Sequence, residues 1–134
     1  MLADRCRRGL LCTLLAVTFV VVAALPAQAA PSPHEQLRID RLIHHVGDQK
    51  GMRFVRNGTE YSADEAARFL RGKLETMGAE VSTAREFIDR IATRSSTSGM
   101  LYQVRFTDGR VLPAAQFMGD ELKRIEAHPA PSTP

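Results

Sequence analysis

The sequence contains very little cysteine, because Cys6 and Cys12 are the only two in its 134 residues. From residue 13 onward there is no disulfide, no thiol nucleophile and no cysteine metal ligand. Residues 30–134 also lack a Gly-x-Ser-x-Gly elbow, a Ser-x-x-Lys pair and a phosphate-cradling glycine loop. The sequence therefore excludes several enzyme classes before it indicates any function.

Residues 1–29 have the pattern of a cleavable signal peptide. Three arginines between positions 5 and 8 precede an apolar run over residues 10–25, and Ala27-Gln28-Ala29 offers the small-x-small pattern read by signal peptidase. An uncleaved membrane anchor is the alternative, but 16 apolar residues fall short of the roughly 20 that a bilayer core requires. We predict cleavage after Ala29, no membrane span thereafter, and a periplasmic location, which the absence of disulfides also favours.

Basic and acidic residues nearly balance once this leader is set aside. The chain has 18 Lys and Arg and 15 Asp and Glu; the leader holds three of the former and one of the latter, so 15 and 14 remain with a net charge of +1. Such a balance gives no electrostatic footprint for nucleic acid. The mature chain of about 105 residues suffices for one domain with a single core. We place that domain at residues 30–127 and predict that the proline-rich tail, residues 128–134, is disordered.

Apolar spacing and capping residues predict four helices. The first covers residues 34–46, where apolar residues recur at i, i+3, i+4 and i+7: Ile39, Leu42, Ile43 and Val46. The second begins with a capping box at Ser62 to Glu65 and ends at Gly78. Its predicted inner line is Ala66, Leu70, Leu74 and Met77. The third begins at Thr83 and runs to about Arg94.

Pro113 is predicted to open the last helix, because proline is tolerated at the first helical position. Its predicted inward residues are Phe117, Met118, Leu122 and Ile125.

Two hairpins supply the predicted strands. Residues 52–56 and 59–61 flank Asn57-Gly58, a dipeptide that tolerates the two positive φ angles of a type I′ turn. Apolar alternation over residues 102–106 predicts another strand, which Asp108-Gly109 turns into Val111-Leu112. The fold class is therefore α+β, with about four helices packed on a small antiparallel sheet of short hairpin strands.

Residues across most of this domain resemble the YfeK-like family of small exported Gram-negative bacterial proteins, a domain of unknown function. The matching positions are Phe54-Val55-Arg56-Asn57-Gly58, Tyr61, Ala66-Ala67, Leu70-Arg71, Lys73-Leu74, Phe87-Ile88, Ile91-Ala92, Ser95-Ser96, Ser98-Gly99 and Tyr102. The chain departs from the family pattern at Phe69 and Leu101, where similar proteins carry histidine and proline. The resemblance implies a periplasmic location and supplies no activity, and Phe69 puts any histidine-dependent activity in doubt.

The stretch of residues 94–99, RSSTSG, holds four consecutive hydroxyl side chains. The favoured interpretation is structural: the hydroxyls and Gly99 satisfy the last carbonyls of the third helix. A second is that they bind a polar or anionic ligand together with Arg94. A third, a serine nucleophile, needs a base within hydrogen-bond reach. No residue is predicted to be catalytic; the candidate ligand-binding residues are Arg56, Asn57, Arg94, Ser95, Ser96, Ser98 and Tyr102.

Two further clusters have less support. Asp40, His44 and Asp48, spaced i, i+4 and i+8, could hold a weak divalent ion, but a solvated helix face needs none, so neither metal nor cofactor is predicted. Several arginines lie in or beside the hairpins and form either an anion-binding face or charged sheet edges, the second being favoured. They are Arg53, Arg56, Arg105 and Arg110, with Arg94 if its segment packs nearby.

Together these features predict a non-enzymatic binding or interaction module for a polar or anionic ligand, or for an unknown envelope component or protein. The alternative is a small envelope hydrolase of unrecognised type.

Overall fold

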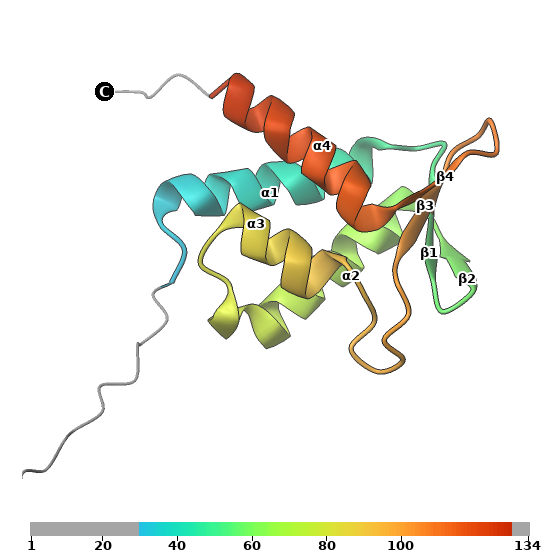
Figure 1. The fold of residues 1–134 in the computed structure, drawn as a ribbon, viewed down its shortest axis with the longest axis horizontal. Helices are drawn as coiled ribbons and strands as arrows, with labels where there is room; N and C mark the ends of the chain where they lie inside the picture. Colours follow the sequence, from blue (N-terminus) through green and yellow to red (C-terminus); the bar gives the residue numbers. More distant parts are fainter. Residues whose placement is uncertain (1–29, 130–134) are drawn as a thin grey trace, which may run out of the picture.

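The computed structural model describes residues 30–129 and places four helical segments beside a four-stranded antiparallel sheet (Figure 1). The α+β fold predicted from the sequence is confirmed. The predicted signal peptide at residues 1–29 and residues 130–134 of the predicted tail lie outside the described residues. Within residues 30–129, no helix has both the length and the apolar character to cross a membrane.

Two helices begin at the predicted polar caps, Ser62 and Thr83, whereas the cap of the first helix, Ser32, was not predicted. Helix α1 (Pro33–Asp48) follows Ser32, whose hydroxyl accepts the Glu35 N–H at 3.2 Å. Helix α2 (Ala63–Met77) has the predicted capping box, in which Ser62 Oγ accepts the Glu65 N–H at 3.3 Å and the Glu65 carboxylate accepts the Ser62 N–H at 2.8 Å. The short 3₁₀ turn η1 (Gly78–Glu80) then ends this segment.

The third helical segment has an irregular interior. After its cap at Thr83, α3 (Ala84–Glu86) continues as a π-helix, η2 (Phe87–Ala92). Helix α4 (Ala114–Ala127) begins one residue later than predicted, because Pro113 is extended (φ −57°, ψ 136°) and ends a strand. Phe117 is only half-buried, whereas Met118, Leu122 and Ile125 are buried.

Both predicted hairpins form. Strands β1 (Arg53–Arg56) and β2 (Thr59–Tyr61) enclose Asn57 (φ 50°) and Gly58 (φ 78°), the two positive φ angles of a type I′ turn. Strands β3 (Gln103–Arg105) and β4 (Val111–Pro113) form the other hairpin, and β1 pairs with β3 to give the order β2-β1-β3-β4. Phe54 is opposite both Tyr61 and Val104. These residues therefore lie on the inner face of the sheet.

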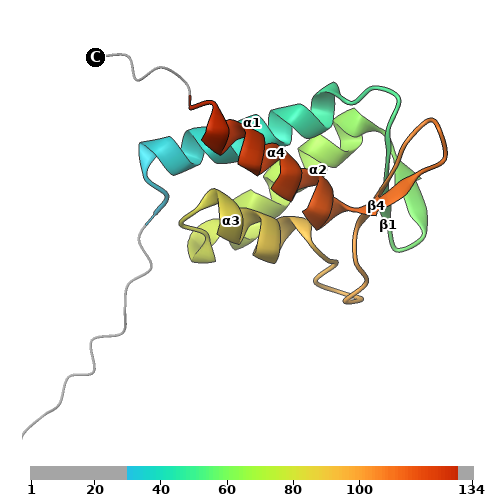
Figure 2. The ribbon, with the colours of Figure 1, turned by 45° about the horizontal axis from the view of Figure 1, so that its top comes forward.

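The sheet lies at one end of the helices, and the core fills the space between them (Figures 1 and 2). Helices α1 and α2 approach closely, since a Cβ at Gly47 would lie 3.3 Å from that of Ala67. The predicted inner line of α2 is wrong at its end: Met77 is 42% exposed, whereas Lys73 is only 8% exposed.

Candidate functional site

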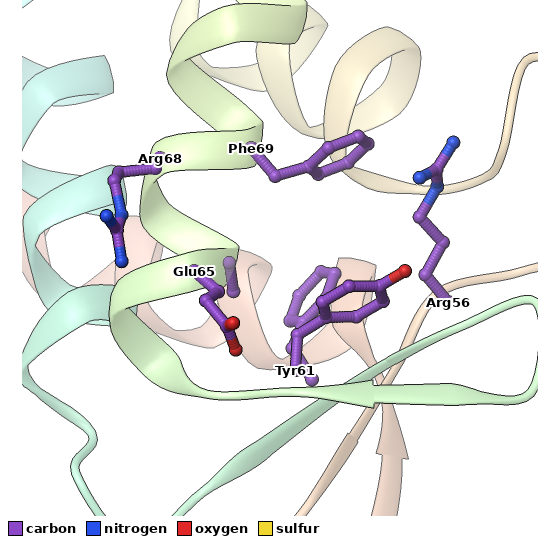
Figure 3. Close-up of a pocket in the computed structure, with 7 residues that line it drawn as sticks. Arg56, Tyr61, Glu65, Arg68 and Phe69 are labelled. Carbon is purple, nitrogen blue, oxygen red and sulfur yellow. The ribbon is translucent and has the colours of Figure 1, made fainter.

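Two neighbouring pockets lie along α2, on the side that faces the β1–β2 hairpin and the loop of residues 94–100. The first has a volume of about 240 Å³ and is lined by Phe54, Arg56, Tyr61, Glu65, Ala66, Arg68 and Phe69 (Figure 3). The second has a volume of about 480 Å³ and is lined by Arg56, Phe69, Gly72, Lys73, Thr76, Met77 and Ser96. Arg56 and Phe69 belong to both linings. We call the two pockets together the α2 groove.

The helix contributes one continuous stripe to this groove. Its lining residues follow helical steps of three and four, from Glu65 and Ala66 to Thr76 and Met77. At 1.5 Å per residue this stripe is about 18 Å long. Aromatic and small apolar side chains prevail in the first pocket, and polar groups are more frequent in the second.

Arg56 separates the two pockets. Its guanidinium carbon lies 4.6 Å from the centroid of the Phe69 ring, within the range of a cation–π contact. Figure 3 shows the phenol oxygen of Tyr61 turned toward Arg56. The Nε atom of Arg56 is buried and has no hydrogen-bond partner among the described residues. Such an unmet donor costs about 1–3 kcal/mol, which an acceptor entering the groove would offset.

Lys73 forms the buried floor beside Arg56. Its Nζ donates to the carbonyls of Ile91 (2.9 Å) and Arg94 (2.7 Å) and to the hydroxyl of Tyr102 (3.2 Å). Burial lowers the pKa of Lys73, and the charge of Arg56 lowers it further. Because all three N–H groups are engaged, Lys73 holds the surrounding backbone and is not placed as a nucleophile.

Tyr102 joins this floor to the core. Its ring contacts Phe54 and Phe69 at centroid distances of 5.6 and 5.8 Å. Burial raises the pKa of Tyr102, while the charge of Arg56 and a hydrogen bond from it act in the opposite direction. The Tyr102 hydroxyl is thus close to two of the groove's cations, Arg56 and Lys73.

The hydroxyl groups of residues 95–98 do not cap the preceding helix, so the favoured structural interpretation is wrong. Ser98 Oγ donates to Asn57 Oδ1 at 2.6 Å. Ser95 Oγ accepts from Asn57 Nδ2 at 3.5 Å and shares a hydrogen bond of 3.0 Å with Thr97. The Lys73 ammonium supplies the donors for the Ile91 and Arg94 carbonyls instead. The loop is therefore attached to the β1–β2 turn.

The seven candidate residues predicted from the sequence lie in one neighbourhood but have different positions in it. Arg56 and Ser96 line the groove, and Tyr102 lies beneath it. Asn57, Ser95 and Ser98 hold the loop to the hairpin turn, and Arg94 contributes its carbonyl while its side chain is exposed. Sequence reasoning missed Lys73, Phe69 and Gly72 as groove residues. The helical line Ala66, Leu70 and Lys73 is the signal that could have identified Lys73.

The candidate metal ligands on α1 do not come together. Asp40 pairs with Arg71 at 3.5 Å, and His44 pairs with Asp48 at 2.9 Å. Across residues 30–129, no group of three or more His, Cys, Asp or Glu side chains is arranged to hold a metal ion.

Histidines and hydroxyls also lie in different pockets. His44 and His45 line a separate pocket of about 210 Å³ with Arg41, Asp48 and Glu121. The α2 groove contains Ser96 but neither of these histidines. Neither the α2 groove nor this separate pocket therefore pairs a serine of residues 95–98 with a histidine base.

The arginines of the hairpins do not form one anion-binding face. Arg53 is opposite Arg105 on the outer face of the sheet, whereas Arg56 is on the inner face. Arg105 pairs with Glu60, and Arg110 pairs with Asp108 at 2.7 Å. The hypothesis of a single arginine surface is wrong, and Arg56 alone of these residues lines the α2 groove.

Comparison with known proteins gives two matches. The family described as "Family of unknown function (DUF5329)" matches residues 33–126. The "Uncharacterized protein YfeK" of Salmonella typhimurium is 37% identical over 82 residues, which cover 61% of this chain and 68% of that protein. No solved structure matches the chain.

Proposed function

Because the chain belongs to DUF5329, a family of unknown function, we propose its function from the α2 groove itself. The protein is a non-enzymatic binding module of the bacterial periplasm that binds an anionic ligand at Arg56. The signal-peptide pattern predicted for residues 1–29 supports this location.

The observation that carries this proposal is the unpartnered Nε of Arg56 at the junction of two pockets. A guanidinium presents its N–H groups as a rigid fork that matches a carboxylate or phosphate. An anion at this point would satisfy the Nε donor and keep the cation close to Phe69.

The surrounding charges favour an anion. Lys73 is a second cation within the same floor, and Arg68 lines the first pocket. Glu65 is the acidic residue in the lining, but its carboxylate accepts hydrogen bonds from the Ser62 N–H and hydroxyl, which lower the pKa of Glu65. The groove therefore has a net positive lining that attracts anions. A small hydrolase, the alternative from the sequence, is supported by no corresponding arrangement in the α2 groove.

Titration with two isosteric probes tests the proposal. Benzoate and benzamide are added separately to the ¹⁵N-labelled mature chain, and amide shifts are followed. We expect benzoate to shift amides of the α2 groove saturably and benzamide to bind at least about tenfold more weakly. Arg56→Gln should remove benzoate binding, whereas Arg110→Gln, a control whose side chain pairs with Asp108 outside the groove, should keep it. Equal benzoate binding by Arg56→Gln and the unmodified protein would contradict the proposal.

A further inference from the structure

The first pocket of the α2 groove has room for one apolar group of side-chain size. Phe54, Tyr61, Ala66 and Phe69 supply most of its wall. Its volume of about 240 Å³ is smaller than the roughly 300–1,000 Å³ of pockets that enclose drug-sized ligands. A long acyl chain therefore fits this pocket less well than a single apolar side chain.

Gly72 gives the second pocket an open floor. It lies in the interior of α2, where glycine is unfavourable, and a Cβ at this position would meet nothing within 4 Å. Internal packing therefore does not require glycine here. Because glycine has no side chain, another backbone can approach the helix surface closely at this position.

The far part of the groove has the length of a short extended chain. From Phe69 to Met77 the helix rises about 12 Å, which corresponds to three or four residues of an extended peptide. The exposed hydroxyls of Thr76 and Ser96 line this part. Ser96 can donate to or accept from the backbone of such a chain, and Thr76, which already donates to the Gly72 carbonyl at 2.6 Å, can accept from it.

We propose that the α2 groove binds the C-terminal end of an extended peptide, with an apolar last side chain in the first pocket, its free carboxylate on Arg56, and the preceding residues over Gly72. This inference rests on the proposed function and names its ligand class. In a peptide that ends in an apolar residue, one Cα atom carries the apolar side chain, the free carboxylate and the amide link to the preceding residues. The groove brings an apolar pocket, an arginine and an open helix surface together at Arg56.

Three synthetic hexapeptides test the inference by amide-shift titration of the mature chain. They are Gly-Ser-Gly-Ser-Gly-Phe as the free acid, the same peptide as the C-terminal amide, and the free acid with serine in place of phenylalanine. We expect the phenylalanine acid to bind about tenfold more tightly than either of the others. Equal binding by the acid and the amide, or by the two acids, would overturn the inference.

Gly72→Ala tests the path of the chain independently of folding. Alanine favours the helix, so we expect a higher melting temperature together with at least about fivefold weaker binding of the phenylalanine acid. Benzoate binding should not change, since that probe needs only Arg56 and the first pocket. Glu75→Ala, an exposed α2 variant outside both linings, is the matched control. Unchanged peptide binding in Gly72→Ala would contradict the chain path.

The two proposals fail in different ways. If benzoate binds through Arg56 while the acid and amide peptides bind alike, the ligand is a small free anion and only the peptide inference is wrong. If neither benzoate nor any peptide shifts the groove amides, the anion-binding function is wrong as well.

Discussion

Replacing Lys73 with methionine should destabilise the fold strongly, because this lysine supplies donors to two backbone carbonyls. Its Nζ lies 2.9 Å from the Ile91 oxygen and 2.7 Å from the Arg94 oxygen. A hydrogen bond from a charged group contributes about 1.5–3 kcal/mol. The loss on substitution is smaller than the sum of two such hydrogen bonds, because burial lowers the pKa of Lys73 and so already disfavours its charged form. We expect a net loss of about 2–4 kcal/mol in the free energy of unfolding.

Urea denaturation followed by far-ultraviolet circular dichroism at neutral pH measures this loss. In a separate thermal scan, the same loss should lower the melting temperature by about 10–20 °C for a domain of this size. Lys50→Met is the matched control, because Lys50 is exposed and pairs with Asp64 at 2.8 Å. An exposed pair of this kind contributes less than about 1 kcal/mol. If Lys73→Met is as stable as Lys50→Met, the two carbonyls do not depend on the lysine and the argument fails.

Two other variants test the groups beside the groove and on α1. Burial lowers the pKa of His45, against the opposing charge of Glu121. As the pH decreases through the ordinary histidine pKa of about 6.5, the unfolded chain therefore binds more protons than the folded one, and the free energy of unfolding decreases. His45→Gln should therefore lose less stability than the unmodified protein between about pH 7 and pH 5 in urea titrations; parallel losses would contradict the assigned shift. Asn57→Gly keeps the positive φ angle but removes the contacts to Ser95 and Ser98, so amide hydrogen exchange should accelerate in residues 95–100. Unchanged exchange there would mean that Asn57 does not hold the loop.

The elements predicted correctly are those whose chemistry lies within a few residues. Ser62 and Glu65 satisfy each other's N–H groups across one turn, so the start of α2 is readable from four residues. Asn57-Gly58 specifies its turn in the same local way. The pairing of β1 with β3 joins segments almost fifty residues apart, with Phe54 opposite Val104, and no local pattern encodes it. The π-helical register of residues 87–92 was not predicted from the sequence either.

The errors at the site have different physical origins. Arg53 and Arg56 are three positions apart, an odd spacing, so strand alternation alone places these two arginines on opposite faces. That signal was present in the sequence. The attachment of the hydroxyl loop was not, because Ser98 and Asn57 are 41 residues apart in the sequence and meet only in the tertiary structure. Lys73 was not predicted to be buried because it is charged, and lysine is rarely buried without partners.

Lys73 and Arg56 share one network, but only Arg56 has a donor without a partner. The three hydrogen bonds of Lys73 fix the Arg94 carbonyl and the Tyr102 hydroxyl, and Ser96 in the lining follows Arg94 by two residues. Loss of Lys73 would therefore displace a groove wall, so binding and stability would fall together. A variant of Arg56 leaves those hydrogen bonds in place. Reduced binding with unchanged stability thus identifies a residue that contacts the ligand. A loss of both binding and stability identifies a residue that holds the groove in place.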